Sequence, residues 1–224
     1  MLLRLQSVLD KTSLDRIRAR LAEAQFDDGR KTAGKRARSV KNNMQLDPAD
    51  EPGKSIGAAV TDALRKHTVF VAAAVPKTIA PVIVSRYVPG MEYGSHVDNA
   101  IMWGQTALRS DIALTVFLTD PKDYDGGELT IEDSTFGVHR LKLPAGDGFL
   151  YPANTLHRVT PVTRGHRDAA VTWIQSLVRG VEQRRILFDL ERIAAGLRSR
   201  APDAAEAGTL SSVYHSLLRL WAEP

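Results

Sequence analysis

A histidine and an aspartate stand two residues apart, at a spacing that suits two ligands of one metal ion. The segment "EYGSHVDNAIM", residues 92–102, carries His96 and Asp98 just after a Pro-Gly turn. Alternate side chains of an extended strand share one face, so both would point the same way, with Val97 opposite. The chain has no cysteine, so a metal must be held by nitrogen and oxygen. We therefore expect His96 and Asp98 to bind one metal ion together.

A third ligand should come from a distant strand of the same sheet system. His157 follows a turn that contains proline in "LYPANTLHRVTPV" and precedes an apolar run. Two histidines and one carboxylate form a facial triad, which occupies one face of an octahedral iron(II) and leaves three positions open. An α-keto acid that chelates through its carboxylate and keto oxygen would fill two of them, and dioxygen the third.

The distal carboxylate of such a co-substrate would need a cation. Arg167 lies ten residues beyond His157, at the start of the next apolar run. A guanidinium there could bind the carboxylate through two parallel hydrogen bonds. Arg164 is a nearby but less well placed competitor.

The elements around these residues fall into three regions. Helical spacing of apolar residues predicts a helix that begins after Thr12 or Ser13 as N-cap, and a second helix over 55–67. Between about 69 and 178, short β-branched and aromatic runs punctuated by Gly and Pro predict a sandwich or barrel of antiparallel strands. Two more helices are expected after Gly180. Their apolar residues would cover the major sheet of the barrel or form a homodimer interface.

The composition fits a folded protein with one sizeable core. The chain has 224 residues, of which 43% are hydrophobic. We expect a helical and mixed region over 1–76, a barrel over 77–178 and a helical extension over 179–224, which makes an α+β protein with a mainly β core.

Several strings resemble the iron(II) and 2-oxoglutarate dioxygenases, and among them the prolyl hydroxylase branch. They are the H-x-D pair, the later histidine with an arginine ten residues on, the segment "YVPGMEYGSHVDN", and "VFLTDPKDYDGGELTI" with its Gly-Gly turn. Trp173 also stands six residues after Arg167, as a tryptophan often does in that branch. The segment "TAGKRARSVKNNMQL" is similar to the N-terminal part of the bacterial PKHD-type hydroxylases, small proteins often linked to iron uptake.

The resemblance implies a double-stranded β-helix of the jelly-roll or cupin-like kind, with terminal helices. By position it implies that His96, Asp98 and His157 bind iron(II) and that Arg167 pairs with the distal carboxylate of 2-oxoglutarate. Dioxygen would be the second co-substrate, and ascorbate the reductant that rescues oxidised iron.

One position departs from the pattern of that branch. Tyr87 matches the tyrosine that approaches the co-substrate, but a second tyrosine is commonly found where this chain has Phe117. Phenylalanine cannot donate a hydrogen bond. Arg167, together with Thr115, would then carry more of the co-substrate anchoring.

Three classes of function remain open. The leading one is an enzyme that hydroxylates a C–H bond of a protein, a peptide or a small metabolite such as a siderophore, with release of succinate and carbon dioxide. The second is a dioxygenase that dealkylates nucleic acid, and the third is a non-catalytic barrel that senses or binds iron.

The charge distribution bears on the nucleic-acid alternative. The net charge is +4, and residues 30–41, "RKTAGKRARSVK", hold six basic residues and no acidic one. A solvated basic loop is the plainer interpretation. The nucleic-acid branch usually has a second arginine six residues after the co-substrate arginine, where this chain has Trp173. Nucleic acid is therefore disfavoured as a partner.

The sequence gives no sign of a membrane partner. The N-terminus lacks a basic start followed by an unbroken apolar segment, and no run approaches the roughly 18 apolar residues of a membrane span. We expect a soluble, cytoplasmic protein.

Overall fold

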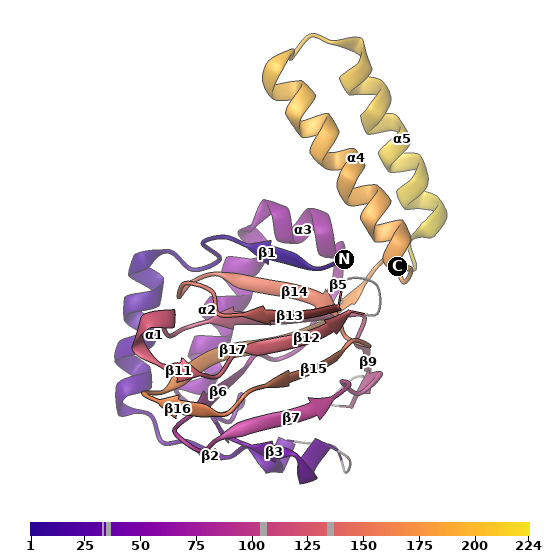
Figure 1. Cartoon of the computed structure of the whole chain (residues 1–224). Coiled ribbons are helices and arrows are strands. Elements are labelled where there is room, and N and C mark those ends of the chain that lie inside the picture. The colour runs from indigo at the N-terminus through magenta and orange to yellow at the C-terminus, as the bar shows by residue number, and fades with distance from the viewer. Residues whose placement is uncertain (33, 35–36, 104–106, 134–136) are drawn as a thin grey trace.

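Two facing β-sheets, with helices packed on the outer side of the larger one, make up most of the molecule (Figure 1). The computed structural model describes residues 1–32, 34, 37–103, 107–133 and 137–224. This arrangement of two antiparallel sheets confirms the predicted α+β jelly-roll class.

The larger sheet joins strands from both halves of the chain. Within the described ranges it has eight strands in the order β1-β14-β10-β17-β6-β4-β2, with β5 also paired to β17. Their bounds are β1 Leu3–Leu5, β2 Asp27–Asp28, β4 Met44–Gln45, β5 Pro76–Ile79, β6 Ile83–Tyr87, β10 Ile112–Phe117, β14 Gly148–Pro152 and β17 Arg167–Ser176.

The smaller sheet carries the expected metal ligands. Its five strands run in the order β13-β12-β15-β7-β3. They are β3 Lys41–Asn42, β7 Glu92–His96, β12 Leu129–Asp133, β13 Gly137–Leu141 and β15 Leu156–Val159. Two short ribbons complete the strands of the described ranges: β8 Ile101–Met102 with β9 Leu108–Arg109, and β11 Asp125–Gly126 with β16 Val162–Arg164.

Three helices near the N-terminus pack against the larger sheet and form its core. They are α1 Lys11–Glu23, α2 Gly53–Lys66 and α3 Thr68–Ala74. Their apolar side chains, including Ile17, Val60 and Phe70, join those of β6, β10 and β17 in one buried cluster. A second cluster, which includes Phe117 and Ile131, fills the space between the two sheets. Three short 3₁₀ turns, η1 Gly29–Thr32, η2 Ala37–Ser39 and η3 Pro121–Asp123, lie in the connections.

Two details of these helices differ from the sequence predictions. The N-cap of α1 is Asp10, because its carboxylate accepts a hydrogen bond from the Ser13 backbone N–H at 2.7 Å. Residues 68–74 form α3 where the sequence predicted the start of the strand-rich region. Here burial of Phe70 and the alanines against the sheet outweighs the strand preference of the neighbouring valines.

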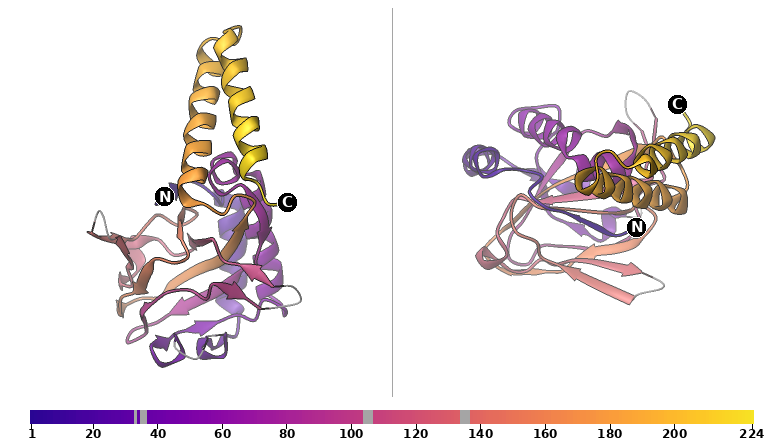
Figure 2. Two further views of the ribbon diagram at one scale, coloured as in Figure 1. Left: turned by 90° about the vertical axis from the view of Figure 1, so that its right-hand side faces the viewer. Right: turned by 90° about the horizontal axis from the view of Figure 1, so that it is seen from above.

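The two C-terminal helices form a hairpin that projects from one end of the sheets (Figures 1 and 2). They are α4 Val181–Arg200 and α5 Ala205–Trp221, and they pack on each other and, through α4, on α3. The expectation that they cover the major sheet is wrong, because α1–α3 already occupy its outer face. Ile186 and Ile193 of the predicted stripe are 40% and 57% exposed, while Leu187 and Phe188 are buried.

No helix in the described ranges has the length and hydrophobicity of a membrane-spanning segment.

The strands β1 to β4 precede residue 76 and belong to the two sheets, whereas α4 begins at Val181. The division of the chain at residues 76 and 178 stays a prediction.

Candidate active site

The three expected metal ligands meet on the inner side of the smaller sheet. His96 ends β7 and lies directly opposite His157 of β15 in the strand register, and Asp98 follows two residues after His96. Candidate ligand atoms of the three side chains all lie within 4.8 Å of one another. Asp98 Oδ1 is 3.8 Å from Nε2 of each histidine. This spacing suits three side chains around one ion.

Backbone carbonyls orient both imidazole rings. His96 Nδ1 lies 2.8 Å from the carbonyl oxygen of Gly94, and His157 Nδ1 lies 2.9 Å from that of Thr155. A carbonyl only accepts, so each Nδ1 carries the proton, and each Nε2 is left with a lone pair. Both Nε2 atoms face Asp98. In metal sites the ligating nitrogen of a histidine points at the ion while the other nitrogen donates a hydrogen bond that fixes the ring, and both histidines here have this arrangement.

Burial sets the charges of this cluster. It lowers the pKa of His96 to about 4, with a further lowering by His157, so His96 is neutral at pH 7. Burial also raises the pKa of Asp98, and the nearby His157 and the indole of Trp173 oppose that rise. The charge of Lys41 opposes the rise as well. A divalent cation bound between the three side chains would place positive charge directly on this nearly enclosed carboxylate.

A second feature of the site is a buried guanidinium without a counter-ion. Arg167 begins β17, opposite Tyr87 of β6, and is 2% exposed. Its Cζ lies 5.3 Å from the ring centre of Tyr87 and 5.4 Å from that of Phe117. It has no carboxylate within 4.0 Å in the described ranges, and its buried Nε has no hydrogen-bond partner there. An unpaired buried charge is strongly unfavourable, so this position fits an anionic ligand.

Tyr124 is a neighbour of Arg167 that the sequence interpretation missed. It is fully buried, and its hydroxyl has no hydrogen-bond partner by geometry in the described ranges. Burial raises the pKa of this phenol, and the charge and the hydrogen-bonding pull of Arg167 oppose the rise, so the two groups are close in space although their geometry falls short of a regular hydrogen bond. Phe117 lacks a hydroxyl, and Tyr124 places one beside the same guanidinium. Its position in the acidic loop 120–127, away from the strand where a tyrosine was expected, hid this role.

One cavity of about 500 Å³ connects the three metal-ligand candidates with Arg167. Its lining contains every residue that the sequence singled out for metal or co-substrate: His96, Asp98, His157, Arg167, Tyr87 and Thr115. Thr115 is buried on β10 near the Tyr151 hydroxyl, and Tyr87 is buried near Asn43. The cavity has the size of an ordinary small-molecule site.

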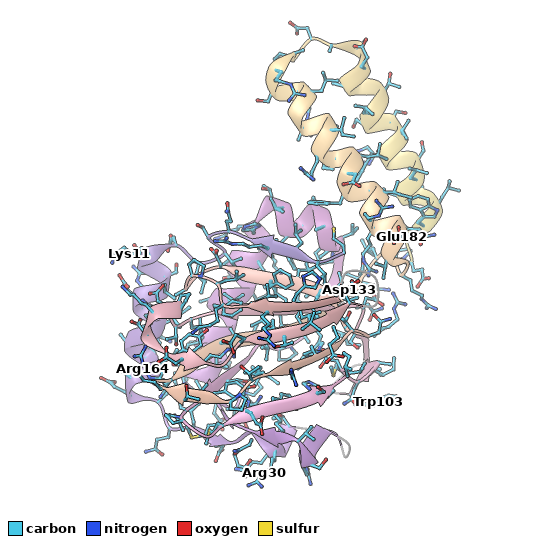
Figure 3. All side chains as sticks on the ribbon, viewed as in Figure 1. Lys11, Arg30, Trp103, Asp133, Arg164 and Glu182 are labelled. Carbon is cyan, nitrogen blue, oxygen red and sulfur yellow. The ribbon has the colours of Figure 1, made fainter. Side chains whose placement is uncertain are left out.

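Arg164, the competitor for the co-substrate role, is elsewhere. Its guanidinium is exposed and donates to Asp125 Oδ2 at 2.7 Å. Figure 3 shows it at the edge of the molecule away from Trp103, which lines the cavity. Arg164 therefore has a carboxylate partner already, whereas Arg167 has none among the residues that the structure describes.

The basic segment 30–41 is partly neutralised within the fold. Arg30 forms an ion pair with Asp28, and Lys31 pairs with Asp27 at 2.9 Å. Lys41 is buried and lines the cavity. Lys35 and Arg36 lie outside the described residues.

Comparison with known proteins agrees with this geometry. Residues 82–175 match the 2OG-Fe(II) oxygenase superfamily, and residues 182–223 match the PKHD-type hydroxylase C-terminal domain. A PKHD-type hydroxylase of Phenylobacterium zucineum is 45% identical, and one of Klebsiella pneumoniae is 46% identical, each over 100% of both chains. The chain belongs to the PKHD-type hydroxylase family. It is accordingly an oxidoreductase of the 2OG-Fe(II) oxygenase class, and the predicted enzyme class is confirmed.

Solved structures support the fold of this family member at lower identity. A Pseudomonas putida prolyl-4-hydroxylase aligns with a TM-score of 0.53 at 17% identity, covering 78% of this chain and 92% of its own. A prolyl hydroxylase from Trichoplax adhaerens, in complex with a hypoxia inducible factor peptide, aligns with a TM-score of 0.59 at 15% identity, covering 83% and 86%. The family implies iron(II), 2-oxoglutarate and dioxygen. The oriented histidines and the unpaired buried Arg167 fit the first two.

Proposed function

We propose that the protein hydroxylates a C–H bond of a small metabolite or peptide. The balanced reaction converts one C–H bond, 2-oxoglutarate and dioxygen into C–OH, succinate and carbon dioxide. The observation that carries the proposal is that an oriented His-Asp-His cluster and a buried, unpaired Arg167 line the same cavity of about 500 Å³. That volume suits a small molecule or a peptide segment beside the co-substrate.

The roles of the residues follow from their positions. His96, Asp98 and His157 would hold iron(II), and the bound iron with its co-substrates supplies the oxidant that C–H hydroxylation requires. Arg167 would bind the distal carboxylate of 2-oxoglutarate, and the Tyr124 hydroxyl would donate a hydrogen bond at the same end. Tyr87 and Thr115 would border that co-substrate, and apolar lining residues such as Leu129 and Val159 would keep water away.

The basic segment does not favour nucleic acid as the substrate. Two of its cations have carboxylate partners and Lys41 faces the cavity, so few of its described charges are free to contact phosphates. We also propose ascorbate as the reductant that restores iron(II) after turnovers in which no substrate is oxidised.

The test is an incubation of the iron(II)-loaded protein with 2-oxoglutarate, ¹⁸O₂ and fractionated metabolites or peptides. We expect one product that gains one labelled oxygen, with an equal amount of succinate. Loss of alkyl groups from a methylated oligonucleotide, with no hydroxylated metabolite or peptide, would replace the proposal with dealkylation. Iron binding without succinate release under every condition would make the protein a non-catalytic iron-binding barrel.

Two variants link the activity to the cavity. Arg167→Ala should raise the 2-oxoglutarate requirement about ten- to a hundredfold, because a charge-assisted hydrogen bond contributes roughly 1.5 to 3 kcal/mol, and iron binding should be retained. The matched control is Arg164→Ala, which removes an exposed guanidinium and should leave the titration unchanged. The reverse result would move the co-substrate role to Arg164.

A further inference from the structure

A second buried cation lines the cavity, on the side of the smaller sheet. Lys41 belongs to the edge strand β3 and lies opposite Tyr93 of β7 in the register. It is 6% exposed, and its side chain lines the cavity. Its Nζ lies 5.3 Å from the centre of the Tyr93 ring, which in turn stacks on His96 with ring centres 3.7 Å apart. One aromatic ring therefore separates the ammonium from a candidate metal ligand.

The ammonium of Lys41 forms no direct ion pair with any residue that the structure describes. In the described ranges its one hydrogen-bond partner is Thr32 Oγ1, at 2.9 Å, and no carboxylate oxygen lies within 4.0 Å of Nζ. An ammonium carries three N–H donors, so most of its donor capacity is unused. Buried lysines are almost always paired, which makes this position unfavourable in the absence of an anion.

The surrounding polar groups hold the ammonium in place without neutralising it. Thr32 donates to Gln45 Oε1 at 2.5 Å, and Gln45 Nε2 donates to Ser85 Oγ at 3.0 Å. Gln45 and Ser85 are both buried. This chain of uncharged groups connects β3 with the larger sheet, and within the described ranges no carboxylate contacts the ammonium of Lys41 directly. Burial lowers the pKa of Lys41 to about 8, against the opposing pull of Asp98, so it is still mainly protonated at pH 7.

The expected co-substrate does not require this second cation. Its distal carboxylate is matched by Arg167, and its keto acid end by the metal site. Arg167 begins β17 near the middle of the larger sheet, whereas Lys41 lies on the edge strand of the smaller one. The charge of Lys41 is thus left for another anion in the same cavity.

The remaining lining indicates what that anion is attached to. Trp103 is 83% exposed, and Val97 and Ile101 are also exposed, yet all three line the cavity. Figure 3 shows Trp103 at the periphery of the molecule. Exposed apolar and aromatic side chains at the rim suit an apolar or aromatic group on the ligand.

We propose that Lys41 is the anchor of a primary-substrate subsite, and that the substrate is an organic carboxylate with an apolar or aromatic body. The inference rests on the proposed hydroxylase function and specifies its substrate class. The carboxylate accepts hydrogen bonds from the Lys41 ammonium, and the apolar body contacts the rim that includes Trp103. Lys41 thereby positions the substrate next to the His96 side of the metal site.

The test compares two probes that differ only in charge, phenylacetate and phenylacetamide. Their affinities are measured by saturation-transfer NMR on protein that has been saturated with manganese(II) and 2-oxoglutarate, so that Arg167 is occupied. We expect the carboxylate to bind about tenfold more tightly than the amide, or more. Paramagnetic broadening of the probe signals by manganese should show that the carboxylate lies in the cavity. The readout needs no turnover, so a failed hydroxylation assay would count against the proposed function and leave this result intact.

Variants at Lys41 decide the assignment. Lys41→Met keeps the length of the side chain and should abolish the preference for the carboxylate, with 2-oxoglutarate affinity changed less than about twofold. Lys41→Arg should retain the preference, which guards against a loss caused by misfolding. The matched control is Lys31→Met, in the same segment but paired with Asp27 at the surface, and it should behave as wild type.

Three results would overturn the proposal. One is an unchanged preference in Lys41→Met. Another is a loss of 2-oxoglutarate affinity of about tenfold in that variant, which would make Lys41 a co-substrate ligand. The third is displacement of phenylacetate by additional 2-oxoglutarate, which would place the probe at Arg167.

Discussion

Three buried polar side chains of this protein lack, among the described residues, the partners that such groups usually have. Arg167 and Lys41 are buried cations without carboxylates in reach, and Tyr124 is a buried phenol without a hydrogen-bond partner, all within the described ranges. A buried polar group without a partner lowers the stability of the folded protein, and a ligand that pairs with the group restores that stability. We therefore expect anions to bind beside Arg167 and Lys41, the two of these groups that line the cavity.

The phenol gives a prediction with two opposite readouts. Tyr124→Phe removes a buried hydroxyl that lies beside Arg167 in the free protein and that we expect to donate a hydrogen bond to the bound co-substrate. We expect the free variant to be as stable as wild type or more so, and to bind 2-oxoglutarate about three- to tenfold more weakly, since a hydrogen bond contributes about 0.5 to 1.5 kcal/mol. Thermal unfolding with and without 2-oxoglutarate measures both. A variant that loses stability but keeps its affinity would show that the hydroxyl serves the fold alone.

The lysine gives a prediction for pH. Its pKa is lowered to about 8 by burial, so the ammonium is charged below that pH and neutral above it. The preference for phenylacetate over phenylacetamide should be present at pH 7 and fade as the pH rises through about 8. Arginine stays charged throughout this range, so the Lys41→Arg protein should keep the preference at pH 9. Equal pH profiles for the two proteins would assign the titration to another group.

At the scale of elements, the short edge strand β3 decides where Lys41 points. It pairs with β7, and the backbone N–H of Gly94 donates to the Val40 carbonyl at 2.8 Å. A Cβ at Gly94 would stand 2.8 Å from Val40 Cβ, closer than real Cβ contacts allow. Glycine at this position therefore lets β3 approach β7 and brings the lysine into the cavity.

Gly94→Ala should push β3 away from β7. We expect the variant to fold, because β3 is at the edge of its sheet, and to lose the preference for phenylacetate while it still binds manganese. The same probe titration measures this effect. Adding Val40→Gly removes the clashing Cβ and should restore the preference. If Gly94→Ala behaves as wild type, β3 is not what holds the lysine in place.

At the scale of the whole molecule, the C-terminal hairpin is a unit attached at one end. It contacts the rest of the chain through a small cluster around Val75, Val178 and Leu187, a bridge between Val178 and Ala222, and ion pairs of Glu223 with Arg109 and Arg179. None of its residues belongs to the two large core clusters in the described ranges. The cavity is also lined without it.

Removal of residues 181–224 should therefore leave a folded barrel with unchanged affinity for manganese and 2-oxoglutarate. We further expect the full chain to be a homodimer held by the hairpin, because its apolar Ile193, Val213 and Leu220 are exposed in the single chain. The shortened protein should then be a monomer. Analytical ultracentrifugation measures both masses. An insoluble product would place the hairpin in the folding core, and a shortened dimer would locate the interface elsewhere.

Local patterns in the chain determined the chemistry of this protein. His96 and Asp98 share a face because strand geometry has a period of two, and Arg167 starts an apolar strand ten residues after His157. These spacings predicted a metal site, an anion-binding arginine and a sandwich or barrel of antiparallel strands, and the resemblance to the 2-oxoglutarate dioxygenases implied the enzyme class and the jelly-roll fold. The sequence also determined that two helices end the chain, since their apolar periodicity is local.

Only the tertiary structure decided which distant side chains lie beside Arg167 and which line the cavity. Tyr124 reaches Arg167 from a loop, and Lys41 reaches the cavity from a segment that, as a sequence, resembles a solvated basic loop. Their roles depend on strand pairing and packing between segments far apart in the chain, which no local period encodes. The surface against which the C-terminal helices pack could not be predicted for the same reason. An apolar stripe shows that a helix face is buried, but only the tertiary packing decides against which surface.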